Sequence, residues 1–186
     1  MTKPLHSAAP AKWAAACLLF SILALCGACR QPDLSGSAEG AGPLLAVGTQ
    51  APDFTLPDSQ GTSVTLSAFE GKSNVVLVFY PGDATPICTH QLCAIRDNWA
   101  AFQRANVTVF GVNPQSAALH RKFIQVQRYP FELLVDANKA VCTAYGTQAG
   151  SRTARTVYGI DREGTIVFAQ RGEPTNKKIL AAFGKK

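Results

Sequence analysis

The chain has 186 residues, of which 47% are hydrophobic and 16% are charged. That length and balance are typical of one globular domain with a core of its own. The net charge of +6 is spread without a run of like charges or a basic face interleaved with aromatic residues, which excludes a nucleic-acid-binding stripe.

Residues 1–28 have the pattern of an export signal. Lys3 and Lys12 form a basic lead, and residues 13–28 (WAAACLLFSILALCGA) form an apolar stretch. This stretch is shorter than the roughly 20 residues of a spanning helix. We therefore predict a signal peptide over residues 1–28.

The exit of this segment, LCGAC, resembles a lipobox, in which a small residue precedes the cysteine that receives a lipid. We expect lipid on Cys29 and a protein anchored at the bacterial cell envelope, facing the periplasm. Two alternatives remain open, namely a soluble exported form cleaved after Ala28 and an uncleaved anchor.

Small and polar side chains continue to Pro43 (QPDLSGSAEGAGP from Gln31), a composition typical of a flexible linker. We therefore expect a tether over residues 29–43 and a folded domain over residues 44–186. On this reading the domain contacts the membrane through its N-terminal anchor alone.

The first elements of the domain are a short hairpin and a buried strand. Residues 54–58 and 62–69 predict the hairpin, with its turn at 58–61. The continuous apolar run NVVLVFY (74–80) is typical of a strand buried on both faces. A helix follows to about Arg104, with Pro86 in its first turn, where the missing N–H costs nothing.

Strand and helix patterns then alternate to the end of the chain. We expect strands at 107–112 and 131–136, helices at 116–127, 138–146 and 175–183, and a hairpin that joins 156–161 to 165–170. Within 116–127, His120 reads as a solvated residue. The order predicts an α/β, thioredoxin-like fold, with a central mixed sheet and helices on both faces.

Cys88 and Cys93 lie five residues apart in the segment YPGDATPICTHQLC. On one helix that spacing gives about 500° of rotation and Cα atoms roughly 8–9 Å apart. A disulfide needs less than about 7 Å, so the pair bridges only if the helix unwinds. That arrangement suits a catalytic pair with two conformations better than a structural disulfide.

The chemistry of the two thiols is expected to differ. Cys88 lies near the helix N-terminus, where free N–H groups and the helix dipole stabilise a thiolate. Cys93 lies a turn and a half further along and gains little of that help. One thiolate beside one waiting thiol suits peroxide reduction through a sulfenic acid, which then condenses to a disulfide.

The segment from Val47 to Trp99 resembles the peroxiredoxins of the bacterioferritin comigratory protein, or PrxQ, branch. Their pattern P-x-x-x-T-x-x-C falls on Pro81, Thr85 and Cys88, and their C-x-x-x-x-C spacing falls on Cys88 and Cys93. The resemblance implies that Cys88 attacks the peroxide and Cys93 resolves the product. It also implies that Thr85 binds the peroxide and that Pro81 shields the site.

The same family uses a distant arginine beside the reactive sulfur. The matching segment here is RTVYGID, which assigns the role to Arg155, although Arg152 lies three residues away. The resemblance further implies a thioredoxin-like protein as reductant, a monomer, and no haem, flavin or metal.

These residues also admit other interpretations. His90 with the two cysteines suggests a metal site, but three ligands in six residues are cramped. Cys142 reads as a core residue. A thiol–disulfide exchange protein is one alternative function, against which the missing C-x-x-C argues. A copper-binding assembly factor is another, for which the gap between the cysteines is one residue too long.

Overall fold

The computed structural model describes residues 40–184, and for Ile87 and Cys88 it describes the backbone alone. The predicted signal, residues 1–28, and Cys29 lie outside the described residues. Within the described range, no helix is long and apolar enough to cross a membrane.

A five-stranded sheet in the order β5-β4-β3-β8-β9 forms the centre of the domain. Its strands are β3 (Asn74–Phe79), β4 (Val107–Asn113), β5 (Glu132–Val135), β8 (Thr156–Ile160) and β9 (Ile166–Arg171). Strand β4 pairs parallel with β3 and with β5, whereas β8 pairs antiparallel with β3 and with β9. The predicted mixed sheet is confirmed.

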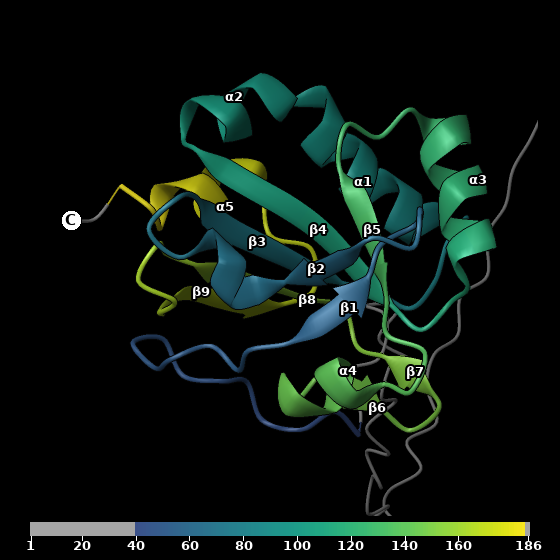
Figure 1. Cartoon of the computed structure of the whole chain (residues 1–186), viewed down its shortest axis with the longest axis horizontal. Helices are drawn as coiled ribbons and strands as arrows, with labels where there is room; N and C mark the ends of the chain where they lie inside the picture. The colour runs from purple at the N-terminus through teal and green to yellow at the C-terminus, as the bar shows by residue number, and fades with distance from the viewer. Residues whose placement is uncertain (1–39, 185–186) are drawn as a thin grey trace, which may run out of the picture. The chain divides into compact units, whose positions relative to one another are not determined.

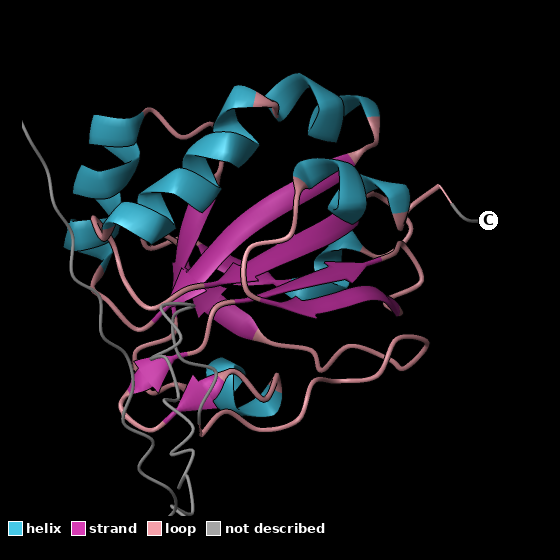
Figure 2. Cartoon of the chain, turned by 180° about the vertical axis from the view of Figure 1, so that it is seen from behind, coloured by secondary structure: helices cyan, strands magenta, loops and turns pink. Residues whose placement is uncertain are grey.

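Helices cover both faces of this sheet, as predicted (Figures 1 and 2). One face carries α1 (Pro86–Asp97), α2 (Trp99–Arg104), α3 (Ala117–Gln127) and α5 (Asn176–Ala181). The other carries α4 (Ala140–Ala144), the hairpin of β1 (Thr55–Pro57) and β2 (Ser63–Thr65), and the short helix η1 (Leu66–Phe69). The two-residue strands β6 (Gln148–Ala149) and β7 (Arg152–Thr153) were not predicted.

Strand β3 is buried on both faces because its side chains alternate between two apolar cores. Val76 and Val78 pack under the helices of the first face, while Leu77 and Phe79 pack under the second. These four residues are fully buried. A continuous apolar, β-branched run is what such a central strand requires.

The predicted helix from Pro86 to Arg104 is two helices. Helix α1 ends at Asp97, and α2 begins at Trp99 after Asn98, whose φ and ψ of −109° and 20° are not helical. Asparagine hydrogen-bonds locally to the backbone and favours helix ends over helix interiors. The break ends the cysteine-bearing helix, and Phe102 of α2 is fully buried.

Contacts of the domain begin slightly before Leu44, the first residue of the predicted domain. Ala41 forms an antiparallel bridge with Ala149, and the Gly42 carbonyl accepts a hydrogen bond of 2.5 Å from Arg171. The last residues of the predicted tether therefore lie against the fold.

Candidate active site

The loop between β3 and α1 carries the predicted motif. Thr85 caps α1 with extended φ and ψ, and Pro86 opens the helix. Cys88 is thus the third helical residue, in the first turn, where backbone N–H groups lack helical acceptors. Pro81 and Thr85 are both exposed, and within the described part the Thr85 hydroxyl makes no capping hydrogen bond.

A buried carboxylate holds this loop in place. Asp83 Oδ1 accepts hydrogen bonds from the Tyr80 hydroxyl at 2.7 Å and from Asn113 Nδ2 at 3.1 Å. Its Oδ2 lies 2.8 Å from Nδ1 of His120, and its backbone N–H donates to Gln115. The loop is therefore tied to the end of β4 and to α3.

The prediction that His120 is solvated was wrong. Its side chain is fully buried against Asp83, whereas Leu119 on the same helix is 47% exposed. Burial of a polar ring is tolerated because the carboxylate supplies a partner. Nε2 of His120 has no hydrogen-bond partner among the described residues.

Arg155 reaches the cysteine-bearing helix from the start of β8. It directly precedes β8, whose first residue, Thr156, pairs with Phe79 at the end of β3. Its Nη1 donates to Oε1 of Gln91 at 2.8 Å, and Arg155 is only 7% exposed. Gln91 lies three residues after Cys88, on the same side of the helix.

Arg152, three residues before Arg155, is exposed in β7. Gln91, the residue that holds Arg155, was missed because a glutamine within an amphipathic helix carries no signal of its own. Its position three residues after a helix-start cysteine, which puts both on one helix face, was the available hint.

Cys93 is half-buried on α1. Its Sγ lies 3.5 Å from Oε1 of Gln127 and 3.8 Å from the Tyr129 hydroxyl. Because α1 is continuous from Pro86 to Asp97, the helical spacing applies and the Cα atoms of Cys88 and Cys93 are roughly 8–9 Å apart. That is too far for a disulfide in this conformation.

Cys142 is a core residue, as predicted. It is fully buried, and its Sγ lies 3.6 Å from Thr153 Oγ1. Burial raises the pKa of the Cys142 thiol to about 12, so this sulfur stays protonated and unreactive at neutral pH.

His90 lies between the two cysteines in sequence and is exposed. Its Nδ1 is 2.5 Å from Glu173 Oε1. Among the described side chains, no three His, Cys, Asp or Glu residues are grouped to hold a metal ion.

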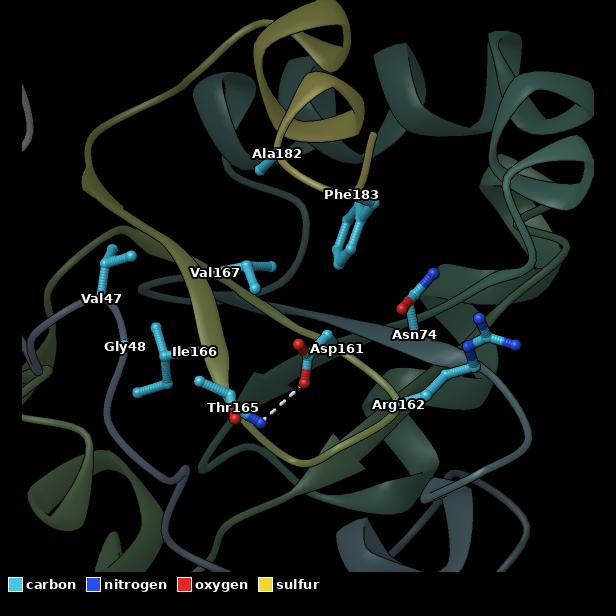
Figure 3. A pocket seen from close by; sticks show the side chains of 10 residues that line it. All are labelled: Val47, Gly48, Asn74, Asp161, Arg162, Thr165, Ile166, Val167, Ala182 and Phe183. Carbon is cyan, nitrogen blue, oxygen red and sulfur yellow. Dashed lines mark hydrogen bonds between the residues drawn. The ribbon is translucent and has the colours of Figure 1, made fainter. Parts of the chain in front are cut away.

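A cavity of about 290 Å³ lies at the other end of β3, near its first residue, Asn74. Figure 3 shows the residues that line it, among them Phe183, Thr165 and Asp161. The backbone N–H of Thr165 donates a hydrogen bond to Asp161 Oδ1. None of its lining residues belongs to the loop before α1 or to α1 itself, so the cavity is separate from the cysteines.

Comparison with known proteins gives one family. Residues 47–169 match the AhpC/TSA family. The chain is 40% identical over 127 residues to the chloroplastic peroxiredoxin Q of Oryza sativa subsp. japonica, covering 67% of this chain and 58% of that protein. It is 38% identical over 130 residues to the putative peroxiredoxin bcp of Coxiella burnetii, covering 66% and 85% respectively. The chain thus spans less than two thirds of the plant relative.

Solved structures agree with this match. Peroxidoxin BcpB of Mycobacterium tuberculosis superposes with a TM-score of 0.72 at 30% identity, covering 75% of this chain and 97% of that one. Peroxiredoxin Q of Xanthomonas campestris gives a TM-score of 0.65 at 28% identity, covering 70% and 89%.

Proposed function

Because the chain belongs to the AhpC/TSA family, and within it to the PrxQ/Bcp branch of peroxiredoxins, we propose that it reduces peroxides with Cys88 as the attacking thiol. The observation that carries this proposal is the position of Arg155. It is buried against Gln91, on the helix whose first turn contains Cys88. A fixed cation and a helix N-terminus at one thiol favour its thiolate.

In the first step, the Cys88 thiolate attacks one oxygen of the peroxide and the O–O bond breaks. Overall, one thiol and one hydroperoxide give a sulfenic acid and an alcohol, or water when the substrate is hydrogen peroxide. Arg155 and the amides of the first turn stabilise the negative charge on the sulfur and on the leaving oxygen. The Thr85 hydroxyl binds the peroxide, and Pro81 shapes the loop that shields it.

In the second step, Cys93 condenses with the sulfenic acid, which gives a Cys88–Cys93 disulfide and one water molecule. Because the helical spacing keeps the two Cα atoms too far apart, the first turns of α1 unwind before this bond forms.

A dithiol protein of thioredoxin type then transfers two electrons to the disulfide and restores both thiols. We assign hydrogen peroxide or organic hydroperoxides as substrates and a monomer as the working form. No haem, flavin or metal takes part in these steps.

The experiment that tests the mechanism is peroxide consumption by the full chain in a reducing system, with products trapped for mass spectrometry. We expect Cys88→Ser to abolish turnover and Cys93→Ser to stop at the sulfenic acid. Cys142→Ser is the matched control and should turn over normally. A parent protein that leaves peroxide untouched but exchanges disulfides with thioredoxin-like proteins would favour the exchange function instead.

We also propose that the domain is lipid-anchored in the cell envelope through Cys29, which rests on the sequence alone. Labelling with a fatty-acid analogue in a bacterial host should mark the parent chain and not Cys29→Ser. Equal labelling of both chains, or none, would exclude this anchor.

A further inference from the structure

Two side chains at the end of α3 hold the thiol of Cys93. Gln127 is the last residue of α3, and Tyr129 follows Arg128, whose φ of 56° ends the helix in the left-handed conformation. Their polar atoms lie 3.5 and 3.8 Å from Cys93 Sγ. Gln127 and Tyr129 together form what we call the Cys93 clamp.

The clamp is itself fixed by packing. The Tyr129 ring is stacked on Phe131, with centroids 5.1 Å apart, and meets Phe123 edge-on at 5.2 Å. Arg96 of α1 donates from Nη1 to the Gln127 carbonyl at 2.6 Å. The end of α3 and the C-terminal half of α1 are thus joined both at Cys93 and three residues beyond it.

The clamp offers the Cys93 thiol one hydrogen-bond acceptor, from Gln127, and one donor, from Tyr129. Burial, and then the contact with Cys93, raises the pKa of Tyr129, so its hydroxyl keeps its proton. The Gln127 Oε1 accepts only, so Cys93 donates to it and receives the Tyr129 hydroxyl hydrogen at the sulfur. Both hydrogen-bonding capacities of the thiol are used while α1 is helical.

Resolution requires Cys93 to leave this position, because the helical spacing keeps its Cα beyond disulfide reach of Cys88. We propose that Gln127 and Tyr129 are positioning residues that slow resolution by holding the Cys93 thiol in the helical state. This inference rests on the proposed peroxidase function. The step it controls converts the Cys88 sulfenic acid and the Cys93 thiol into the disulfide and one water.

The clamp therefore sets how long the sulfenic acid persists. While it persists, a second peroxide can oxidise it to the sulfinic acid, with the peroxide reduced to an alcohol or water. Contacts present in the helical state but absent from the unwound one add to the barrier between them. A weaker clamp should speed resolution and protect Cys88 from this second oxidation.

The test compares Tyr129→Phe and Gln127→Leu with the parent full chain. After rapid mixing with one equivalent of hydrogen peroxide, the sulfenic acid is trapped at timed intervals with a sulfenic-acid reagent and quantified by mass spectrometry. Each hydrogen bond to sulfur is weak, so we expect disulfide formation about two- to fivefold faster in each variant. At high peroxide, both should accumulate less Cys88 sulfinic acid.

Tyr145→Phe is the matched control. Its hydroxyl donates to the Pro52 carbonyl at 2.8 Å on the opposite face of the sheet. This substitution also removes one buried tyrosine hydroxyl, but a hydroxyl that does not contact Cys93. The variant should therefore form the disulfide at the parental rate. If Tyr129→Phe fails to fold, as judged by circular dichroism, Gln127→Leu carries the test.

The outcomes separate the two proposals. Parental or slower resolution in the folded clamp variants, with a normal disulfide in the parent, would overturn the clamp and leave the peroxidase function standing. A parent that consumes peroxide without forming a Cys88–Cys93 disulfide would overturn the clamp and leave peroxide reduction by Cys88 standing. A parent that leaves peroxide untouched would overturn both.

Discussion

Arg155 and Arg152 lie three residues apart, yet their surroundings differ completely. Arg155 is 7% exposed and bound to Gln91 of α1, whereas Arg152 is exposed in β7. We expect Arg155→Met to lower the kcat/KM for hydrogen peroxide roughly 100- to 1,000-fold, because the proposed mechanism then lacks its fixed positive charge at the reacting atoms. Steady-state kinetics would measure this effect.

Arg152→Met is the control for that substitution and should change kcat/KM little. The opposite ranking, with Arg152→Met the more damaged variant, would move the catalytic arginine to Arg152.

Cys142 makes the stability of the protein sensitive to alkaline pH. Burial raises the pKa of its thiol to about 12 from an ordinary 9.0. Above pH 9, the unfolded chain loses a proton here that the folded chain keeps. The free energy of unfolding therefore falls as pH rises, by up to about 1.4 kcal/mol per pH unit from this group.

Urea unfolding of the parent and Cys142→Ala between pH 8 and 10 would measure this term. We expect a smaller fall in Cys142→Ala, since other groups that titrate there are common to both chains. Equal slopes would show that Cys142 is not the group responsible.

At the scale of elements, the loop before α1 depends on one buried carboxylate. Asp83→Ala removes the acceptor of Tyr80, Asn113 and His120. Buried donors without an acceptor are costly, so we expect a loss of about 2–4 kcal/mol in the free energy of unfolding. Peroxidase activity should fall with it, because the loop carries Thr85 and leads into Cys88.

Asp97→Ala provides the comparison in urea unfolding. Its ion pair with Arg96 is at the surface, and such pairs contribute less than about 1 kcal/mol. A loss in Asp83→Ala no larger than in Asp97→Ala would mean that the network does not hold the loop.

Sequence periodicity predicted the central elements because their signals are strong. The run NVVLVF has the composition of a strand buried on both faces of a sheet, and it forms β3. Periodicity did not predict the end of α1 at Asn98, and it did not predict the burial of His120. A histidine that is buried beside a carboxylate 37 residues away in the chain cannot be distinguished by periodicity from an exposed one.

At the scale of the molecule, formation of the disulfide should loosen α1 and leave the sheet intact. Strand β3 is buried in two cores, whereas Thr85, which caps α1, and Pro86, its first residue, are exposed. We expect amides in residues 87–93 to exchange hydrogen faster after stoichiometric peroxide treatment, with β3 and β8 unchanged. Hydrogen–deuterium exchange with mass spectrometry would compare the two forms.

The same measurement on Cys93→Ser separates unwinding from oxidation as such. Faster exchange in that variant too would show that the sulfenic acid alone opens the helix. Unchanged exchange in the oxidised parent would contradict the need for unwinding.

The motif identified four candidate site residues because they are close in sequence: Pro81, Thr85, Cys88 and Cys93. The contacts that surround them were not predictable in the same way. Gln91 with Arg155, Asp83 with His120, and Cys93 with Tyr129 are pairs brought together by the order of the strands. Such pairs leave no local pattern in a single sequence.

Strand β8 pairs with β3 and not with β5, the strand of the central sheet that precedes it in the chain, and this order has a consequence for synthesis. A chain growing on a ribosome carries both cysteines 62 residues or more before Arg155 is added, as the numbering shows. Until β8 pairs with β3, the guanidinium has no fixed place at α1. Cys88 is thus made early as an ordinary cysteine, and the arginine that we propose as its partner arrives only when most of the domain has been translated.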